Sequence, residues 1–150
     1  MSVKTSSKFM FIVKMLAYAF LYGLFIINII DLTTKAFAWY HIFLIMLYFF
    51  PFIIVCLILG FDDWELLVGL GLLSSLMNDL FYGVIGNILF HTNYDLREWF
   101  MNQLGFNDGK YLFTFMGGLF TLRVTSLIMG LSIYARLVLV YAVLYKWWKE

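Results

Sequence analysis

Long apolar stretches separated by short polar segments dominate this sequence of 150 residues. Four such stretches follow one another along the chain, at about residues 9–30, 39–60, 64–90 and 111–148. A helix needs about 20 apolar residues to cross a bilayer, and each stretch is at least that long. Membrane strands would instead alternate apolar and polar residues over about 10 positions. The pattern therefore predicts an all-α integral membrane protein with four transmembrane helices, organised as a single membrane domain over residues 1–150.

The N-terminal stretch shares some features with a secretory signal peptide. Lys4 and Lys8 precede the apolar run, and Ala36-Phe37-Ala38 offers a small-residue cleavage pattern. However, the apolar run is longer than the core of about 7–15 residues that signal peptides carry. We therefore interpret this stretch as the first membrane helix.

The composition also indicates a lipid environment. Hydrophobic residues make up 64% of the chain and charged residues 13%, whereas soluble domains contain about 45–50% and about 25%. A small water-soluble globule could not cover its surface with so few polar groups. The net charge of +1, with no basic patch, excludes a typical nucleic-acid-binding protein. The partners that remain are membrane lipid and other membrane proteins.

The distribution of Lys and Arg predicts the orientation. Five lysines flank the outer ends of the first and last stretches: Lys4, Lys8, Lys14, Lys146 and Lys149. The opposite side carries fewer positive charges: Lys35, Arg97 and Lys110. Because positive residues accumulate in cytoplasmic segments, we expect both termini in the cytoplasm and a multi-pass location in the cell (plasma) membrane.

The polar segment after the third stretch predicts a short amphipathic helix at about 94–104, outside the cytoplasm. Asn93 could cap this helix, and the apolar residues after it follow helical spacing. His91, Asp95 and Glu98 would share one face if the helix began early enough, and an imidazole with two carboxylates can hold a divalent cation. These three residues are a metal-site hypothesis, set against the simpler interpretation that they are solvated.

Asp79 is the most informative residue, because it stands near the middle of the third stretch. A charge at the bilayer centre costs at least about 2.5–3.5 kcal/mol on insertion scales. Positions spaced by four on this helix are small or polar: Gly71, Ser75, Asp79, Gly83 and Asn87. Asn78 widens the stripe, and Glu65 lies near the cytoplasmic end of the same helix. Such a stripe predicts a face that packs against another helix.

Two arginines in the last stretch could pair with Asp79. If the fourth crossing starts near Tyr111, Arg123 reaches the depth of Asp79; if it starts near Phe120, Arg136 does. The second arrangement makes 111–119 an interfacial or re-entrant piece with its bend at Gly117-Gly118, and we favour it. Small and polar residues at helical spacing match this face: Gly118, Thr121, Thr125, Ser132 and Arg136.

Asp79 therefore has two interpretations. It could fix helix packing as a buried ion pair or hydrogen-bonded acid, or it could bind a proton or cation with Glu65 and one of the arginines. The sequence contains no phosphate-binding loop, zinc-protease motif or nucleophile elbow. We expect no cofactor, and a non-catalytic role for the chain by itself.

Three functional hypotheses follow. The first is a small accessory or structural subunit of a larger membrane complex, for example an energy-transducing oxidoreductase or a membrane monooxygenase. The alternative is an oligomeric transporter or channel that uses Asp79. The third is a membrane-embedded enzyme.

Overall fold

A computed structural model describes residues 3–34, 39–59, 64–115 and 120–149. Its elements, in chain order, are α1 (Val3–Leu21), the π-helix η1 (Tyr22–Ile27), α2 (Asn28–Thr34), α3 (Tyr40–Leu59), α4 (Trp64–Phe90), α5 (Leu96–Gln103), β1 (Lys110–Phe115), β2 (Phe120–Thr125) and α6 (Ser126–Lys149). The possible cleavage pattern Ala36-Phe37-Ala38 and the expected bend at Gly117-Gly118 both lie outside the described residues.

Within the described residues, four helical segments are long and apolar enough to cross a membrane: Phe9–Thr34, Tyr40–Ile58, Trp64–Phe90 and Ser126–Trp147. This confirms the helical class and the number of long apolar helices. The first segment is continuous through α1, η1 and α2, and it reaches four residues beyond the predicted end at residue 30.

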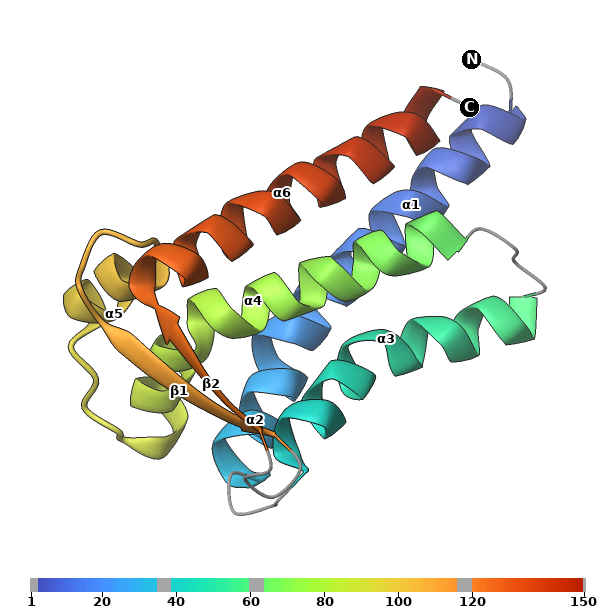
Figure 1. Ribbon diagram of the computed structural model, residues 1–150. Helices are drawn as coiled ribbons and strands as arrows, with labels where there is room; N and C mark the ends of the chain where they lie inside the picture. The colour runs from blue at the N-terminus through green and yellow to red at the C-terminus, as the bar shows by residue number, and fades with distance from the viewer. Residues whose placement is uncertain (1–2, 35–38, 60–63, 116–119, 150) are drawn as a thin grey trace.

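Helix α4 lies at the centre of the bundle (Figure 1). It contacts α1, η1, α2, α3 and α6. It is also the least apolar of the four, with a mean hydropathy of 1.4 against 2.1–2.6 for the others. Yet 61% of the apolar stretch of α4 is buried inside the protein, against 11–22% of the corresponding stretches of the other three. The most polar helix is thus inside and the most apolar helices are outside, which is the arrangement that a hydrocarbon surrounding favours.

The fourth predicted stretch differs from the structure. Strands β1 and β2 pair in an antiparallel way, with Lys110 opposite Thr125 and Phe115 opposite Phe120, and α6 begins only at Ser126. The helix expected over 111–148 is therefore wrong over β1 and β2, and the favoured start near Phe120 is six residues too early. Thr121 and Thr125 of the expected stripe lie on a strand and not on the helix that carries Ser132 and Arg136, and Gly118 lies outside the described residues. The sequence of β2 alternates apolar and polar residues, and alternation with a period of two favours a strand.

The structure has a short helix, α5, after the third stretch, and its position along a membrane surface stays a prediction; its first residue also differs from the expectation. Asp95 is the N-cap, and its Oδ1 accepts hydrogen bonds from the backbone N–H groups of Arg97 and Glu98 at 2.9 and 3.2 Å. Asn93, the expected cap, has a φ of 58° and lies before the helix. The helix is held at its C-terminal end where Gly130 of α6 approaches the Leu104 carbonyl too closely for any side chain.

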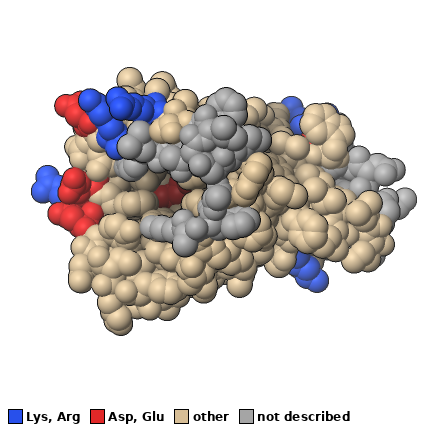
Figure 2. Space-filling view, turned by 60° about the horizontal axis from the view of Figure 1, so that its bottom comes forward, with Lys and Arg blue, Asp and Glu red and all other residues tan. Residues whose placement is uncertain are grey.

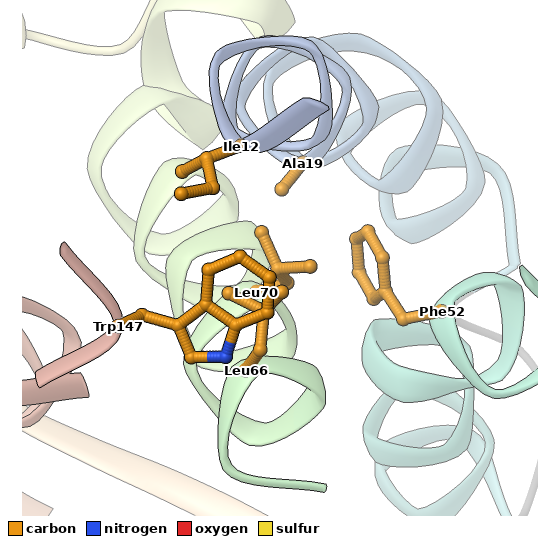
Figure 3. Packing of buried hydrophobic residues seen from close by; sticks show 6 residues of the cluster. All are labelled: Ile12, Ala19, Phe52, Leu66, Leu70 and Trp147. Carbon is orange, nitrogen blue, oxygen red and sulfur yellow. The ribbon is translucent and has the colours of Figure 1, made fainter. Parts of the chain in front are cut away.

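A buried apolar cluster joins α1, α3, α4 and α6 (Figure 3). Its members are Ile12, Ala19, Phe52, Leu66, Leu70 and Trp147. Because Ile12 lies near the start of the first helix and Trp147 near the end of the last, both ends of the chain lie at the same end of the bundle (Figure 1).

Charged side chains are unevenly distributed over the surface (Figure 2). On the face shown, they gather mainly at the end that carries α5, with a few basic side chains toward the opposite end. Acidic atoms are also visible deep in a hollow near the middle of this face. The described surface between the two ends is mostly uncharged, which suits contact with lipid or with other apolar helices.

Candidate functional site

The central polar contact of the bundle joins Asp79 of α4 to Arg136 of α6. Arg136 Nη2 lies 2.6 Å from Asp79 Oδ2, and the two side chains are 23% exposed for Asp79 and 15% for Arg136. Of the two arginines considered from sequence, Arg136 is the one that the fold brings to Asp79. Arg123 instead lies in β2 opposite Leu112, with its side chain exposed.

The guanidinium of Arg136 makes further hydrogen bonds on both helices. Its Nη1 donates to Ser75 Oγ at 2.9 Å, and its Nε donates to the Ser132 carbonyl at 3.2 Å. Ser75 and Asp79 are one helical turn apart, so a single arginine spans two positions of the small and polar stripe of α4. This geometry ties the two helices in one register, because a planar guanidinium has fixed donor directions.

Glu65 belongs to a separate contact between the same two helices. Its Oε2 accepts a hydrogen bond from Lys146 Nζ at 2.6 Å, and both side chains are partly exposed. Glu65 is 14 residues before Asp79 on α4, a distance of about 21 Å along the helix axis. It therefore does not join the polar contact around Asp79.

A second buried acid, which the sequence interpretation missed, lies beside this contact. Asp31 of α2 is only 6% exposed, and its Oδ2 accepts a hydrogen bond from Asn78 Nδ2 at 2.9 Å. Two acids from different helices thus lie close together: Asp31 of α2 is bonded to Asn78, and Asp79 is the next residue on α4. The small or polar residues Gly23, Asn28 and Asp31, close together in or just after the first apolar stretch, could have signalled this second polar face.

Asn28 extends the polar region along α2. It is fully buried, and its Nδ2 donates to the carbonyls of Gly23, Leu24 and Met77 at 3.1, 2.8 and 3.4 Å. The first two carbonyls lie in the π-helix η1. A π-helical turn changes the regular backbone pairing, and such turns are frequent at functional sites. The amide of Asn28 compensates this irregularity and links it to α4.

The expected metal ligands do not assemble on one helix. His91 has a φ of 51°, and α5 begins only at Leu96, so His91 lies outside the helix. The Asp95 carboxylate is occupied as the N-cap. Among the residues that the structure describes, no group of three His, Cys, Asp or Glu is placed to hold a metal. The described geometry therefore does not support the metal-site hypothesis for His91, Asp95 and Glu98.

The chain was compared with protein-family models, curated proteins and solved structures, and none of them matches. The chemistry of the site has to be inferred from its own geometry. Carboxylates, amides, hydroxyls and one guanidinium can fix helices in place by hydrogen bonds, and the carboxylate, amide and hydroxyl oxygens can also bind protons or cations. The described residues of this cluster include no Ser, Cys or Lys nucleophile beside a histidine base.

Proposed function

We propose that this protein is a small multi-pass subunit of a larger complex in the cell membrane, with a non-catalytic role and both termini in the cytoplasm. The observation that carries the proposal is the ion pair of Asp79 with Arg136. Through this pair, Asp79 joins α4 to α6. A largely shielded ion pair of this kind is well suited to fixing helix register.

The outer face of α6 supports a protein partner. Tyr141 is 68% exposed, and its ring stacks on Tyr145 with centroids 6.0 Å apart. Tyr141 precedes Lys149 by eight residues, which is about 12 Å along the helix. A phenol hydroxyl at that depth costs free energy in hydrocarbon unless it finds an acceptor. A neighbouring transmembrane helix with polar or small residues would provide one.

Complexes such as energy-transducing oxidoreductases and membrane monooxygenases contain small helical subunits of this type. That assignment is an analogy of architecture, since the described residues carry no motif of either class. The partners expected are therefore membrane lipid and other membrane subunits.

The test is purification of the tagged full-length chain from its membrane in a mild detergent. We expect other membrane proteins to co-migrate in a constant ratio through two chromatographic steps. Tyr141→Leu combined with Tyr145→Leu should lower this recovery several-fold, because both hydroxyls are lost. Leu57→Ala, at an exposed apolar position of α3, is the matched control and should leave recovery unchanged. Recovery of the wild type as a stable, lone monomer would contradict the proposal.

An oligomeric transporter or channel is the second candidate. It is favoured by the buried Asp31, which gives the membrane helices a second acid next to Asn78 and Asp79. The test is ion and proton flux in proteoliposomes for the wild type, Asp79→Asn and Asp31→Asn. Flux that either substitution abolishes would support transport. Absence of flux in the wild type would exclude it.

A further inference from the structure

Two cations share one face of the paired strands β1 and β2. Lys110 of β1 lies opposite Thr125 of β2, and Arg123 stands two residues before Thr125. Because side chains alternate between the two faces of a strand, these three residues project from the same face. Their side chains are exposed, whereas Val124, on the other face, is only 7% exposed. Lys110 and Arg123, the basic pair, therefore point away from the protein.

The charges of the basic pair are not neutralised within the described part of the chain. Neither Lys110 nor Arg123 forms an ion pair with a residue that the structure describes. Asp108, the nearest acid along the chain, is exposed and bonded to neither. Diagonal neighbours on paired strands have Cβ atoms about 7–8 Å apart, so two long side chains can reach one anion between them. Such an anion would offset the repulsion of the two like charges.

The basic pair lies at the edge of the apolar bundle. Strands β1 and β2 lie at the end that carries α5, opposite the two ends of the chain (Figure 1). The apolar span of α6 begins at Ser126, only three residues after Arg123. Because such a span fills the hydrocarbon core of a bilayer, the residues just before it lie at the level of the lipid headgroups. Phospholipid phosphates lie at this level.

The surface of α6 next to the basic pair is apolar. Leu127, Ile128 and Leu131 are 60%, 51% and 59% exposed. These side chains carry no polar atom, so hydrocarbon covers them without leaving a hydrogen bond unmade. The partner surface proposed around Tyr141 is separate, since Tyr141 is 14 residues beyond Leu127, or about 21 Å along the helix. Cations at headgroup level beside an apolar helix surface are complementary to one phospholipid.

We propose that the basic pair and the first turns of α6 bind one anionic phospholipid. Its phosphate accepts hydrogen bonds from Lys110 Nζ and the Arg123 guanidinium, and its acyl chains pack against Leu127 and Leu131. A guanidinium matches the geometry of phosphate oxygens, and a lysine adds a second point charge. The bound lipid would hold the two strands against the start of α6. This site does not require the proposed subunit role.

The experiment measures lipid binding to the full chain in a neutral detergent by native mass spectrometry. Phosphatidylglycerol is compared with phosphatidylcholine of the same acyl chains, whose quaternary ammonium cancels the phosphate charge. We expect the wild type to bind one phosphatidylglycerol at least about fivefold more tightly than phosphatidylcholine. Lys110→Gln and Arg123→Gln should each weaken that binding about fivefold, which is the contribution of one basic side chain near an anionic headgroup. Arg123→Lys should retain it.

Arg97→Gln is the matched control, because it removes an exposed cation of α5 at the same end of the bundle. It should bind phosphatidylglycerol as the wild type does, and an equal loss there would overturn the site in favour of general charge attraction. A folded wild type with no preference for phosphatidylglycerol would also overturn it, and this comparison needs no variant.

Soluble glycerophosphoglycerol has the same phosphate without acyl chains. Displacement of the lipid by an equal concentration of this compound would overturn the assignment to a phospholipid, whereas we expect the lipid to stay bound. None of these results bears on co-purification with partner subunits, so failure here and failure of the subunit proposal can be distinguished.

Discussion

Arg136 of α6 and Asp79 of α4 are joined at 2.6 Å, in surroundings where both side chains are largely shielded. The same two helices are joined a second time by Lys146 and Glu65, also at 2.6 Å, but there the side chains are 53% and 31% exposed. Equal distances therefore do not imply equal energies. Removing one partner of a buried pair leaves an uncompensated charge, whereas an exposed charge is solvated and screened.

The first prediction concerns this buried pair. Asp79→Leu should lower the free energy of unfolding by about 2–3 kcal/mol, because Arg136, which is 15% exposed, then stays largely shielded without its carboxylate. The double variant Asp79→Leu with Arg136→Leu should recover most of the loss, since neither charge remains. Unfolding in mixed detergent and dodecyl sulfate micelles measures both values.

Glu65→Gln is the control for the buried pair, and it should change the unfolding free energy by less than about 1 kcal/mol. If the double variant is as unstable as Asp79→Leu, the ion pair is not the source of the effect.

The sequence was sufficient to predict the four long apolar helices, because the length of an apolar run can be read from neighbouring residues alone. It also pointed to Asp79, since one acid inside such a run is conspicuous. Asp31 was not found in this way, because it follows the apolar run and looks like the first residue of a loop. Only the packing of α2 on α4 buries it beside Asn78.

Strands β1 and β2 were missed for a related reason. Residues 111–125 are about as apolar as the helices, so composition alone extends the fourth stretch over them. The available signal was the alternation of Thr121, Arg123 and Thr125 with Leu122 and Val124. That signal covers only one strand. The choice between strand and helix was decided by pairing with residues 110–115, which is not a local property.

A second prediction tests the close approach of the first helical segment to α4. A Cβ atom on Gly23 would overlap the backbone of Ser74, which cannot move away cheaply, whereas one on Gly69 would meet only the side chain of Val143 at 3.0 Å. Gly23→Ala should therefore destabilise the protein by about 1–3 kcal/mol, and Gly69→Ala by clearly less. The same micelle unfolding assay ranks the two, and equal losses would argue against this packing.

The third prediction concerns the attachment of α5. The Trp99 ring lies 5.4 Å from the rings of both Tyr82 and Tyr94. Each aromatic pair contributes about 0.5–1.5 kcal/mol beyond the buried area, so Trp99→Ala should release the segment around α5. Limited proteolysis in nanodiscs should then cleave there faster than in the wild type. Phe106→Ala, at an exposed position of the same segment, should leave the cleavage rate unchanged.

The fourth prediction tests the orientation in the membrane. Cys56 is the only cysteine, so Cys56→Ser gives a background without thiols. In that background, Arg97→Cys should react with a membrane-impermeant maleimide added outside intact cells, whereas Lys149→Cys should react only after permeabilisation. The reverse labelling pattern would place the termini outside. Labelling of both positions in intact cells would contradict a bundle with its two ends on opposite sides of the membrane.

The last prediction asks what solvent surrounds the bundle. Phe52 is fully buried, with ring contacts to Tyr18 and Tyr22 at centroid distances of 5.9 and 6.1 Å, whereas Phe50 is 55% exposed on the same helix. In water, truncating a buried Phe costs about 3–5 kcal/mol, which combines transfer from water with the cavity left behind. In a bilayer the separated helices still lie in hydrocarbon, so only the packing part of this cost remains. Phe52→Ala in nanodiscs should therefore lose less than about 3 kcal/mol yet clearly more than Phe50→Ala, whose side chain exchanges one apolar contact for another. A large loss at Phe50 would mean that a specific neighbour, rather than lipid, covers that face of α3.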